Sequence, residues 1–212
     1  MNAARALISD FGGVLTTPLA DAFGAYERDS GIEMATIGEA IQRAADSDGA
    51  HPLYELEKGT LTEGAFLERL ERELGDGVSL AGLSATYFAN LHPNAEMIAW
   101  MAETKRGREV RTALLTNNIR EWEAQWRAML PEIDGIFDVV VDSAFVGMRK
   151  PDPEIYELML ERLGGGLAAS DCVFVDDLEP NCEAARELGM RVVRFESAEQ
   201  AIPELEAALA GG

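Results

Sequence analysis

Short apolar runs that end abruptly in acidic or hydroxyl residues constrain the fold of this chain more than any other feature. Each run is rich in aliphatic residues, as a buried strand is, and has polar residues directly after it. Three runs end in this way: 6–9 before Asp10, 113–115 before Thr116, and 172–175 before Asp176 and Asp177. In an open parallel sheet, ligands bind outside the carboxyl ends of the strands. The pattern therefore predicts one site assembled from segments that lie far apart in the sequence.

The rest of the chain favours a sheet whose strands alternate with helices. Two more runs, 138–141 and 191–195, have a strand-like composition. A helical pattern begins at Pro153, with an aspartate before it as N-cap, and stops at Gly164; a second covers about 180–188. Strands that alternate with helices imply crossover units. We therefore predict an α/β fold with a doubly wound parallel sheet.

A long segment after the first strand does not follow this alternation. Its apolar residues keep helical spacing, as in Phe66 and Leu70. The predicted division is a core of residues 1–17 and 92–212 and a helical cap of residues 18–91. An insertion at this point would emerge over the carboxyl edge of the sheet, where it could act as a lid. The alternative is a helical subdomain that only stabilises the fold.

The charge of the chain excludes some partners. Its formal net charge is -20, with 38 acidic and 18 basic residues among 212. Such a chain repels phosphate groups on average, which opposes binding to nucleic acid or to an anionic membrane surface. A phosphorylated substrate would need locally organised positive charge. A homodimer is one candidate assembly.

Cysteine and histidine are scarce. The two cysteines, Cys172 and Cys182, fit a reducing compartment, and we expect no disulfide. The two histidines, His51 and His92, lack the spacing of zinc ligands. The N-terminal residues contain no long apolar core, and no stretch approaches the ~18 apolar residues of a membrane span. We expect a cytoplasmic protein.

Four short motifs, taken in order, resemble those of the haloacid dehalogenase-like (HAD) hydrolase superfamily. They are Asp10-Phe-Gly-Gly-Val, Leu114-Leu-Thr116-Asn, Lys150-Pro-Asp-Pro and Phe174-Val-Asp176-Asp177. The insertion looks like the type 1 cap of that superfamily. Residues 56–66 are similar to a stretch of its glucose-1-phosphatase-like and epoxide hydrolase N-terminal phosphatase-like branch. The resemblance implies a Mg²⁺-dependent phosphatase acting on a small phosphorylated metabolite.

The resemblance also implies roles for single residues. Asp10 would attack phosphorus and form an aspartyl-phosphate that water then hydrolyses. Thr116 would donate its hydroxyl to the phosphoryl group, helped by the backbone N–H of Asn117. Lys150 would neutralise the nucleophile and the phosphate. The alternatives are an aspartate and a Thr-Asn pair that merely form turns, and a solvated surface lysine.

The acidic pair Asp176-Asp177 suggests a metal. Two carboxylates at the end of an apolar run are costly unless a cation or donors meet them. Mg²⁺ takes oxygen ligands, so Asp10 and Asp177, the main-chain carbonyl of Gly12, and Asp176 directly or through water would hold it. Asn181 would orient this group. The alternative is that the aspartates cap the helix that follows, which Asp177 is expected to do in part.

Gly12 departs from the superfamily pattern. Phosphatases of the superfamily usually carry a second aspartate at this position, which protonates the leaving oxygen and later activates water. General acid–base help is worth ~10²–10⁴-fold, so its loss favours substrates with good leaving groups. Anomeric sugar, acyl and aryl phosphates qualify. Alternatively, a cap residue such as Glu55 or Glu57 supplies the proton.

Two other functions stay open. A haloacid dehalogenase uses its aspartate to attack carbon and lacks the second aspartate, although the acidic pair argues against a metal-free enzyme. A catalytically weak, ligand-binding member is the other alternative, because a fold and its pocket can persist after chemistry fades.

Overall fold

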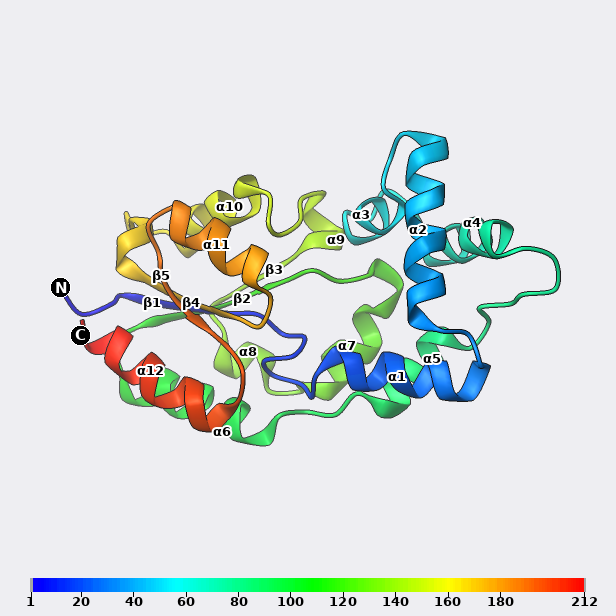
Figure 1. Cartoon of the computed structure of the whole chain (residues 1–212). Coiled ribbons are helices and arrows are strands. Elements are labelled where there is room, and N and C mark those ends of the chain that lie inside the picture. Colours follow the sequence, from blue (N-terminus) through cyan, green and yellow to red (C-terminus); the bar gives the residue numbers. More distant parts are fainter. Residues whose placement is uncertain (1, 212) are drawn as a thin grey trace.

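The computed structural model describes residues 2–211 and contains, within that range, a five-stranded parallel sheet (Figure 1). The strand order is β3-β2-β1-β4-β5, so the first strand lies in the middle. The strands are β1 (Ala6–Ser9), β2 (Arg111–Thr116), β3 (Val139–Asp142), β4 (Cys172–Asp176) and β5 (Arg191–Arg194). The predicted α/β fold is confirmed, and the strand ends differ from the prediction by at most two residues.

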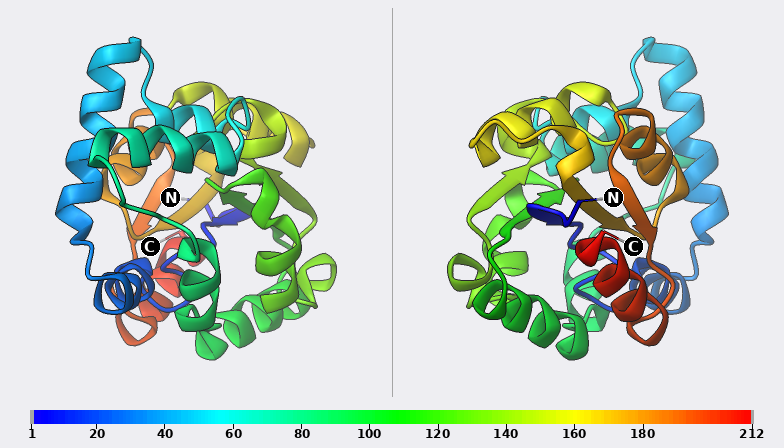
Figure 2. Two further views of the ribbon diagram at one scale, coloured as in Figure 1. Left: turned by 90° about the vertical axis from the view of Figure 1, so that its right-hand side faces the viewer. Right: turned by 90° about the vertical axis from the view of Figure 1, so that its left-hand side faces the viewer.

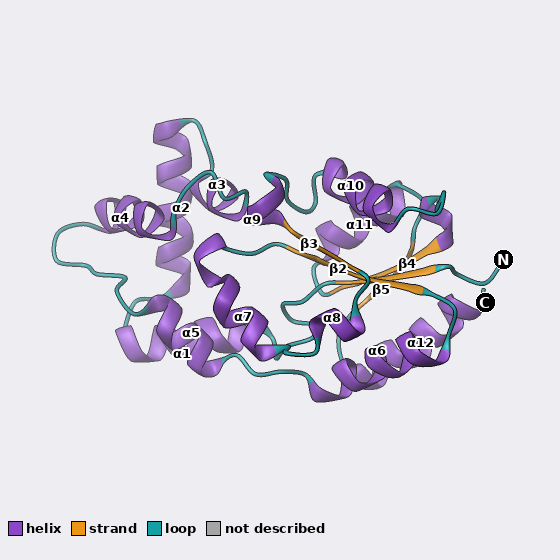
Figure 3. Cartoon of the chain, turned by 180° about the vertical axis from the view of Figure 1, so that it is seen from behind, coloured by secondary structure: helices purple, strands orange, loops and turns teal. Residues whose placement is uncertain are grey.

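Helices cover both faces of the sheet because successive strand residues point to opposite sides. Leu7 and Val173 pack on one side, and Ile8 and Phe174 pack on the other. The first side is covered by α6 (Ala95–Gly107), α8 (Ile133–Ile136) and α12 (Ala198–Ala210), and the second by α10 (Pro153–Leu163) and α11 (Glu179–Glu187) (Figure 3). The central strands β1 and β4 are therefore buried on both faces, which explains why their residues are almost all apolar.

Helix α10 begins and ends where its sequence predicts. Asp152 is the N-cap residue and Gly164 the C-cap residue. The Asp152 side chain makes no cap hydrogen bond, however, and its carboxylate instead contacts Lys58 Nζ at 2.9 Å. Lys58 belongs to the helical insertion, so this ion pair joins the insertion to the core.

Helices also form the segment between β1 and α6. They are α1 (Leu19–Ser30), α2 (Met34–Asp48), α3 (Pro52–Glu57), α4 (Glu63–Leu74) and α5 (Leu83–Asn90). Their apolar faces make a second apolar core that includes Tyr26, Ile37 and Leu70, and Trp122 from outside the insertion packs into it. They lie beyond the carboxyl ends of the strands, and the two ends of the chain lie at the opposite end of the molecule (Figure 1). Figure 2 views the molecule from these two ends, with the insertion in front of the sheet in one view and behind it in the other.

The segments that enter and leave the insertion run side by side. Thr17 donates its backbone N–H to His92 O at 2.8 Å, and an isolated antiparallel bridge joins Thr16 to Pro93. The remaining short elements are η1 (Arg120–Trp122), α7 (Glu123–Met129), α9 (Ser143–Val146) and η2 (Ala169–Asp171). Within residues 2–211, every helix is too short or too polar to cross a membrane.

Candidate active site

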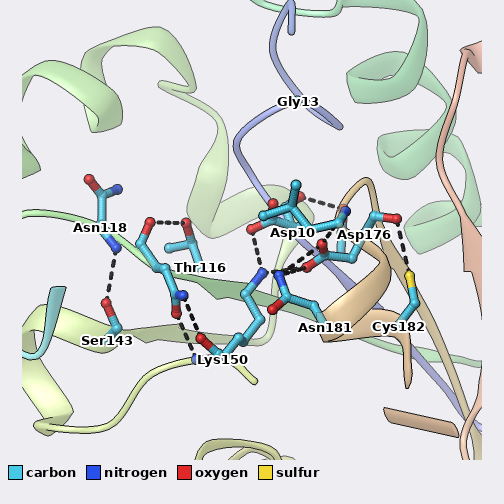
Figure 4. A network of polar contacts seen from close by, with 12 residues as sticks. Asp10, Gly13, Thr116, Asn118, Ser143, Lys150, Asp176, Asn181 and Cys182 are labelled. Carbon is cyan, nitrogen blue, oxygen red and sulfur yellow. Dashed lines mark hydrogen bonds and ion pairs between the residues drawn. The ribbon is translucent and has the colours of Figure 1, made fainter. Parts of the chain in front are cut away.

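Lys150 lies at the centre of a buried polar cluster at the carboxyl edge of the sheet (Figure 4). Its Nζ contacts Asp10 Oδ1 at 2.7 Å and Asp176 Oδ2 at 2.6 Å. Asp10 follows β1, and Asp176 is the last residue of the adjacent strand β4. Because Lys150 is only 1% exposed, the alternative of a solvated surface lysine is wrong.

Asp176 is held from several sides. Its Oδ1 accepts the Leu178 backbone N–H at 2.9 Å, and both carboxylate oxygens lie within 3.1 Å of Asn181 Nδ2. Asn181 is itself fixed, since its carbonyl accepts the Tyr156 hydroxyl at 2.9 Å. With Lys150 included, the Asp176 oxygens are fully engaged by protein donors.

Asp177 does not cap the following helix. The N-cap residue of α11 is Leu178, and no side-chain cap hydrogen bond is present. The expectation that Asp177 partly caps this helix is therefore wrong. Its carboxylate lies instead against Gly13, where an added Cβ would sit 2.3 Å from Asp177 Oδ2. Gly13, at φ +78°, is thus required by both its backbone conformation and the approach of Asp177.

Thr116 is the last residue of β2, the strand on the other side of β1, and Asn117 follows it. Thr116 is buried at the end of β2. The Asn117 amide exchanges two hydrogen bonds with the main chain of Lys150: Nδ2 donates to Lys150 O at 2.9 Å, and Oδ1 accepts the Lys150 N–H at 2.8 Å. This side chain therefore fixes the loop that carries the lysine.

The cluster has more negative than positive charge. One carboxylate oxygen from each of Asp10, Asp176 and Asp177 lies within 4.8 Å of the others. Burial raises the pKa of Asp10, and Lys150 opposes the shift. Burial and the charge of Asp176 raise the pKa of Asp177 to about 6. Burial would lower the pKa of Lys150, but the two carboxylates outweigh it and hold that pKa above its ordinary value.

The charge and the donor atoms of this cluster show whether it suits a metal ion. Three carboxylates lie close together, only two of them contact the Lys150 ammonium group, and the donor set consists of oxygen atoms. Hard divalent cations such as Mg²⁺ prefer oxygen ligands, and a second cation would offset the charge that burial makes costly. The residues present fit such an ion.

Gly12 is covered by an apolar side chain. An added Cβ at this position would lie 3.1 Å and 3.2 Å from the two Cδ atoms of Leu19, the first residue of α1. The place where the superfamily usually carries its second aspartate is therefore occupied by hydrocarbon from the insertion.

Beside Gly12 lies a cavity of about 210 Å³ between the insertion and the core. Its lining is largely apolar and aromatic. The lining residues are Phe11, Gly12, Leu19, Phe23, Leu53, Glu57, Tyr87, Phe88, Leu91, Thr116, Asn117, Asn118, Ile119, Trp122 and Trp126. Its polar lining residues include Thr116 and Asn117 at the end of β2.

Glu57 and Glu55, the two cap carboxylates singled out as proton donors, point to different places. Glu57 lines this cavity, and its carboxylate accepts from Arg149 Nε of the core. Burial raises the pKa of Glu57, and Arg149 opposes the shift. Glu55 does not line the cavity and contacts Arg69 Nη1 at 2.9 Å instead.

Sequence reasoning missed the residues that join the insertion to the core. The Ser143 hydroxyl accepts the Asn118 backbone N–H at 2.9 Å and donates to Glu57 O at 2.6 Å. It also missed Leu19 and the aromatic lining, of which Trp122 packs among insertion residues. Each belongs to a local pattern that fits an ordinary core or turn residue, so the sequence carries no separate signal for them.

In this fold, parallel strands bring Asp10, Thr116 and an acidic pair to one edge of the sheet, around a buried lysine. This arrangement is typical of a class of doubly wound α/β hydrolases. The chain belongs to the haloacid dehalogenase-like hydrolases: the model of that family matches residues 4–189. The family suggested by the four motifs is thereby confirmed.

Curated relatives include much longer proteins. Acyl-CoA dehydrogenase family member 10 of Mus musculus is 33% identical over 97% of this chain but only 19% of its own length. Bifunctional epoxide hydrolase 2 of Sus scrofa is 28% identical over 96% of this chain and 38% of its own length. A sesquiterpene phosphatase of Aspergillus oryzae is 30% identical over 88% of this chain and 87% of its own.

Solved structures share the fold. A HAD family enzyme of Bacteroides thetaiotaomicron, in complex with magnesium and inorganic phosphate, has a TM-score of 0.66 at 21% identity and covers 91% of this chain and 94% of its own. An L-2-haloacid dehalogenase of Xanthobacter autotrophicus has a TM-score of 0.63 at 20% identity, covering 96% of this chain and 83% of its own. At these identities the likeness concerns the fold alone.

Proposed function

We propose that the protein is a Mg²⁺-dependent phosphatase that acts on a small phosphorylated metabolite through an aspartyl-phosphate intermediate. The observation that carries this proposal is the buried contact of Lys150 with Asp10 and Asp176 beside Asp177. A phosphoryl group brings negative charge, and a nucleophilic carboxylate can approach it only where cations offset that charge.

In this proposal the Asp10 carboxylate attacks phosphorus in line, the P–O bond to the organic group breaks, and the alcohol leaves. Water then hydrolyses the resulting aspartyl-phosphate, an acyl phosphate, and releases inorganic phosphate. Lys150 holds the Asp10 carboxylate in place and neutralises the transferring group. Thr116 and the backbone N–H of Asn117 donate to the phosphoryl oxygens on which negative charge accumulates. The Asn117 amide positions Lys150 through its two hydrogen bonds to the Lys150 main chain.

Asp10, Asp177 and the carbonyl of Gly12 would hold Mg²⁺. Asp176 would orient the site without being the main ligand, because its oxygens already accept from Lys150, Asn181 and Leu178. When bound, the ion supplies positive charge to the phosphoryl oxygens. A HAD family enzyme of Bacteroides thetaiotaomicron with the same fold has been solved in complex with magnesium and inorganic phosphate, which supports magnesium as the proposed ion.

Residues 18–91 would act as a cap that closes over the substrate. The paired segments at Thr17-Pro18 and Leu91-Pro93 are the proposed hinges, because they are the points at which the insertion leaves and rejoins the core. Closure would exclude water and strengthen the field of Lys150 on the substrate. We also propose a cytoplasmic location, which the two buried free thiols support.

Position 12 suggests a substrate with a good leaving group. Glycine cannot protonate a leaving oxygen, and Leu19 fills the neighbouring space with methyl groups. Without a general acid, an ester of a poorly acidic alcohol loses ~10²–10⁴-fold in rate. Acyl, anomeric and aryl phosphates lose less, because their leaving oxygens carry the negative charge more readily.

Glu57 is a second candidate for the missing acid, favoured by its place in the cavity beside Gly12. Rates of aryl phosphates with leaving groups of graded acidity distinguish the two proposals. If Glu57 donates a proton, the hydrolysis rate of the wild-type protein depends only weakly on the acidity of the leaving group. In Glu57→Gln the rate should then depend on it strongly. Glu55→Gln is the matched control and should leave it unchanged. A steep wild-type dependence that Glu57→Gln does not alter would eliminate Glu57 as the donor.

The phosphatase proposal is tested by phosphate release from p-nitrophenyl phosphate, acetyl phosphate, glucose 1-phosphate and glucose 6-phosphate, with and without Mg²⁺. We expect metal-dependent turnover that disappears in Asp10→Asn, with glucose 6-phosphate the slowest. Metal-independent chloride release from a 2-haloacid would instead establish the dehalogenase. Phosphate binding without turnover of any ester would establish a ligand-binding member.

A further inference from the structure

A second cavity adjoins the one beside Gly12. It has a volume of about 250 Å³ and lies among the helices of the insertion. We call it the inner cavity; its lining residues are Phe23, Met34, Ile37, Ile41, Leu53, Leu56, Glu63, Phe66, Leu67, Leu83, Ile119 and Trp122. The cavity beside Gly12 is the outer cavity. Phe23, Leu53, Ile119 and Trp122 line both cavities and form the boundary between them.

The boundary has an informative composition. Phe23 and Leu53 come from the insertion, whereas Ile119 and Trp122 come from the core segment that follows β2. All four side chains are apolar over most of their surface. A ligand that crosses this boundary would therefore exchange water for hydrocarbon and aromatic contacts, which favours an apolar group and disfavours a hydroxylated one.

The two cavities discriminate between classes of phosphate ester. The outer cavity has polar lining residues near Thr116, Asn117 and Asn118 and one carboxylate, Glu57. The inner cavity has one charged lining residue, Glu63, at the first position of α4. A sugar phosphate would leave several hydroxyl groups without partners in such a space, and each costs about 1–3 kcal/mol.

We propose that the inner cavity binds the apolar tail of the substrate, which makes the substrate a phosphate monoester of a long hydrocarbon or alkyl-aromatic group. This inference rests on the proposed phosphatase function, because it places the phosphoryl group at Asp10 and Thr116. The organic group then passes Gly12 and Leu19 through the outer cavity. Its far end lies between Phe23, Leu53, Ile119 and Trp122 and reaches the inner cavity.

A series of 4-alkylphenyl phosphates tests this subsite. Lengthening the alkyl chain leaves the acidity of the phenol nearly constant, so it changes tail burial without changing the leaving group. We expect kcat/KM to rise roughly fourfold per methylene, from the free energy of burying a CH₂ group, until the inner cavity is filled. A series that turns over at a rate independent of chain length would overturn the proposal.

Two substitutions on α4 form a matched pair. Leu67 lines the inner cavity, whereas Leu74, seven residues later, is equally half-buried but lines neither cavity. The readout is the ratio of kcat/KM for 4-octylphenyl phosphate to that for phenyl phosphate. Leu67→Phe should lower this ratio at least tenfold, and Leu74→Phe should retain the wild-type ratio. Equal ratios in the two variants would contradict the assignment.

Failure of the phosphatase proposal would be visible separately, as absence of turnover of every ester by the wild-type protein. The binding of 4-alkylphenyl phosphonates, measured by calorimetry, then tests the subsite without turnover. Affinity that rises with chain length, and no longer rises in Leu67→Phe, would support the inner cavity as the tail site. Affinity that is independent of chain length in the wild-type protein would refute it.

Discussion

Lys150 is the residue on which the geometry of the site depends most. It is buried between Asp10 and Asp176, and the Asn117 amide holds its main chain. A cation in this position is costly to bury by itself but offsets the repulsion between the carboxylates. We therefore propose that its role is structural as well as chemical.

Lys150→Met should cost about 3 kcal/mol of unfolding free energy in the absence of Mg²⁺, because it leaves two buried carboxylates without the cation that neutralises them. The matched control is Lys105→Met, which removes an ion pair to Asp138 at the protein surface and should cost below about 1 kcal/mol. Urea denaturation measures both. Equal losses in the two variants would contradict a central role for the Lys150 cluster.

Restoring an aspartate at position 12 needs two changes. Leu19 lies 3.1 Å from the Cβ that Gly12→Asp would introduce, so the single variant crowds the start of α1. We expect Gly12→Asp with Leu19→Ala to raise the rate on poor leaving groups by at least tenfold over Leu19→Ala alone. Turnover of alkyl phosphates is the measurement, and an unchanged rate would mean that the missing acid does not limit specificity.

At the scale of elements, the loop after α3 and the short helix α9 join the insertion to the core. Gly59 lies so close to α9 that an added Cβ would sit 2.2 Å from Ala144 O. Arg120 donates to the same carbonyl at 2.6 Å, and Ser143 donates to Glu57 O. These contacts place the carboxylate-bearing end of α3 over the active site.

Gly59→Ala should therefore weaken the closed arrangement of the insertion. Gly49, which ends α2, is the matched control: its φ of +72° is close to the +67° of Gly59, but an added Cβ there meets nothing within 4 Å. Gly49→Ala should cost about 1 kcal/mol for the left-handed backbone, and Gly59→Ala should cost more and also raise KM. Similar KM values for both variants would indicate that the contact with α9 has no part in substrate binding.

Asp142, which follows the apolar part of β3, gives a pH-dependent prediction. Burial raises its pKa from 3.8 to about 6, although the Ala144 backbone N–H opposes the shift. The folded protein thus binds this proton more tightly than the unfolded chain, so its stability falls as pH rises from about 4 to about 6. Asp142→Asn should raise unfolding free energy by about 2 kcal/mol at pH 7 and by little at pH 4. Thermal unfolding at both pH values would show this, and a destabilised variant at pH 7 would contradict it.

The elements that form the site are easier to predict from the sequence than the contacts between those elements. Apolar runs with polar ends locate the strands and Asp10, Thr116 and Asp176, because both signals are local. The same local reasoning suggests that Asp177 caps α11, yet the structure places its carboxylate against Gly13. That contact joins positions more than 160 residues apart in the sequence, and no local pattern specifies it.

At the scale of the whole molecule, the insertion and the core each supply part of the two cavities. Trp122 of the core packs with Phe23 and Leu53 of the insertion around one boundary. In the sequence these residues belong to ordinary amphipathic patterns, so the cavities become visible only when the two parts are in contact. Specificity is therefore a property of the assembled molecule.

The net charge of -20 should influence substrate binding. The average field repels a phosphate dianion, and salt screens this repulsion over roughly 10 Å at 0.1 M ionic strength. We expect kcat/KM for p-nitrophenyl phosphate to rise about twofold or more between 10 and 150 mM KCl at saturating Mg²⁺. A decrease would mean that local positive charge around Lys150 dominates the encounter.

The most direct test of the central claim is to trap the phosphoryl group on Asp10. Acid quenching during Mg²⁺-supported turnover of p-nitrophenyl phosphate, followed by mass spectrometry of peptides, identifies the residue that carries it. We predict a phosphoryl adduct on Asp10 that is missing without Mg²⁺ and in Asp10→Asn. An adduct on another residue would contradict the account, as would continued turnover by Asp10→Asn.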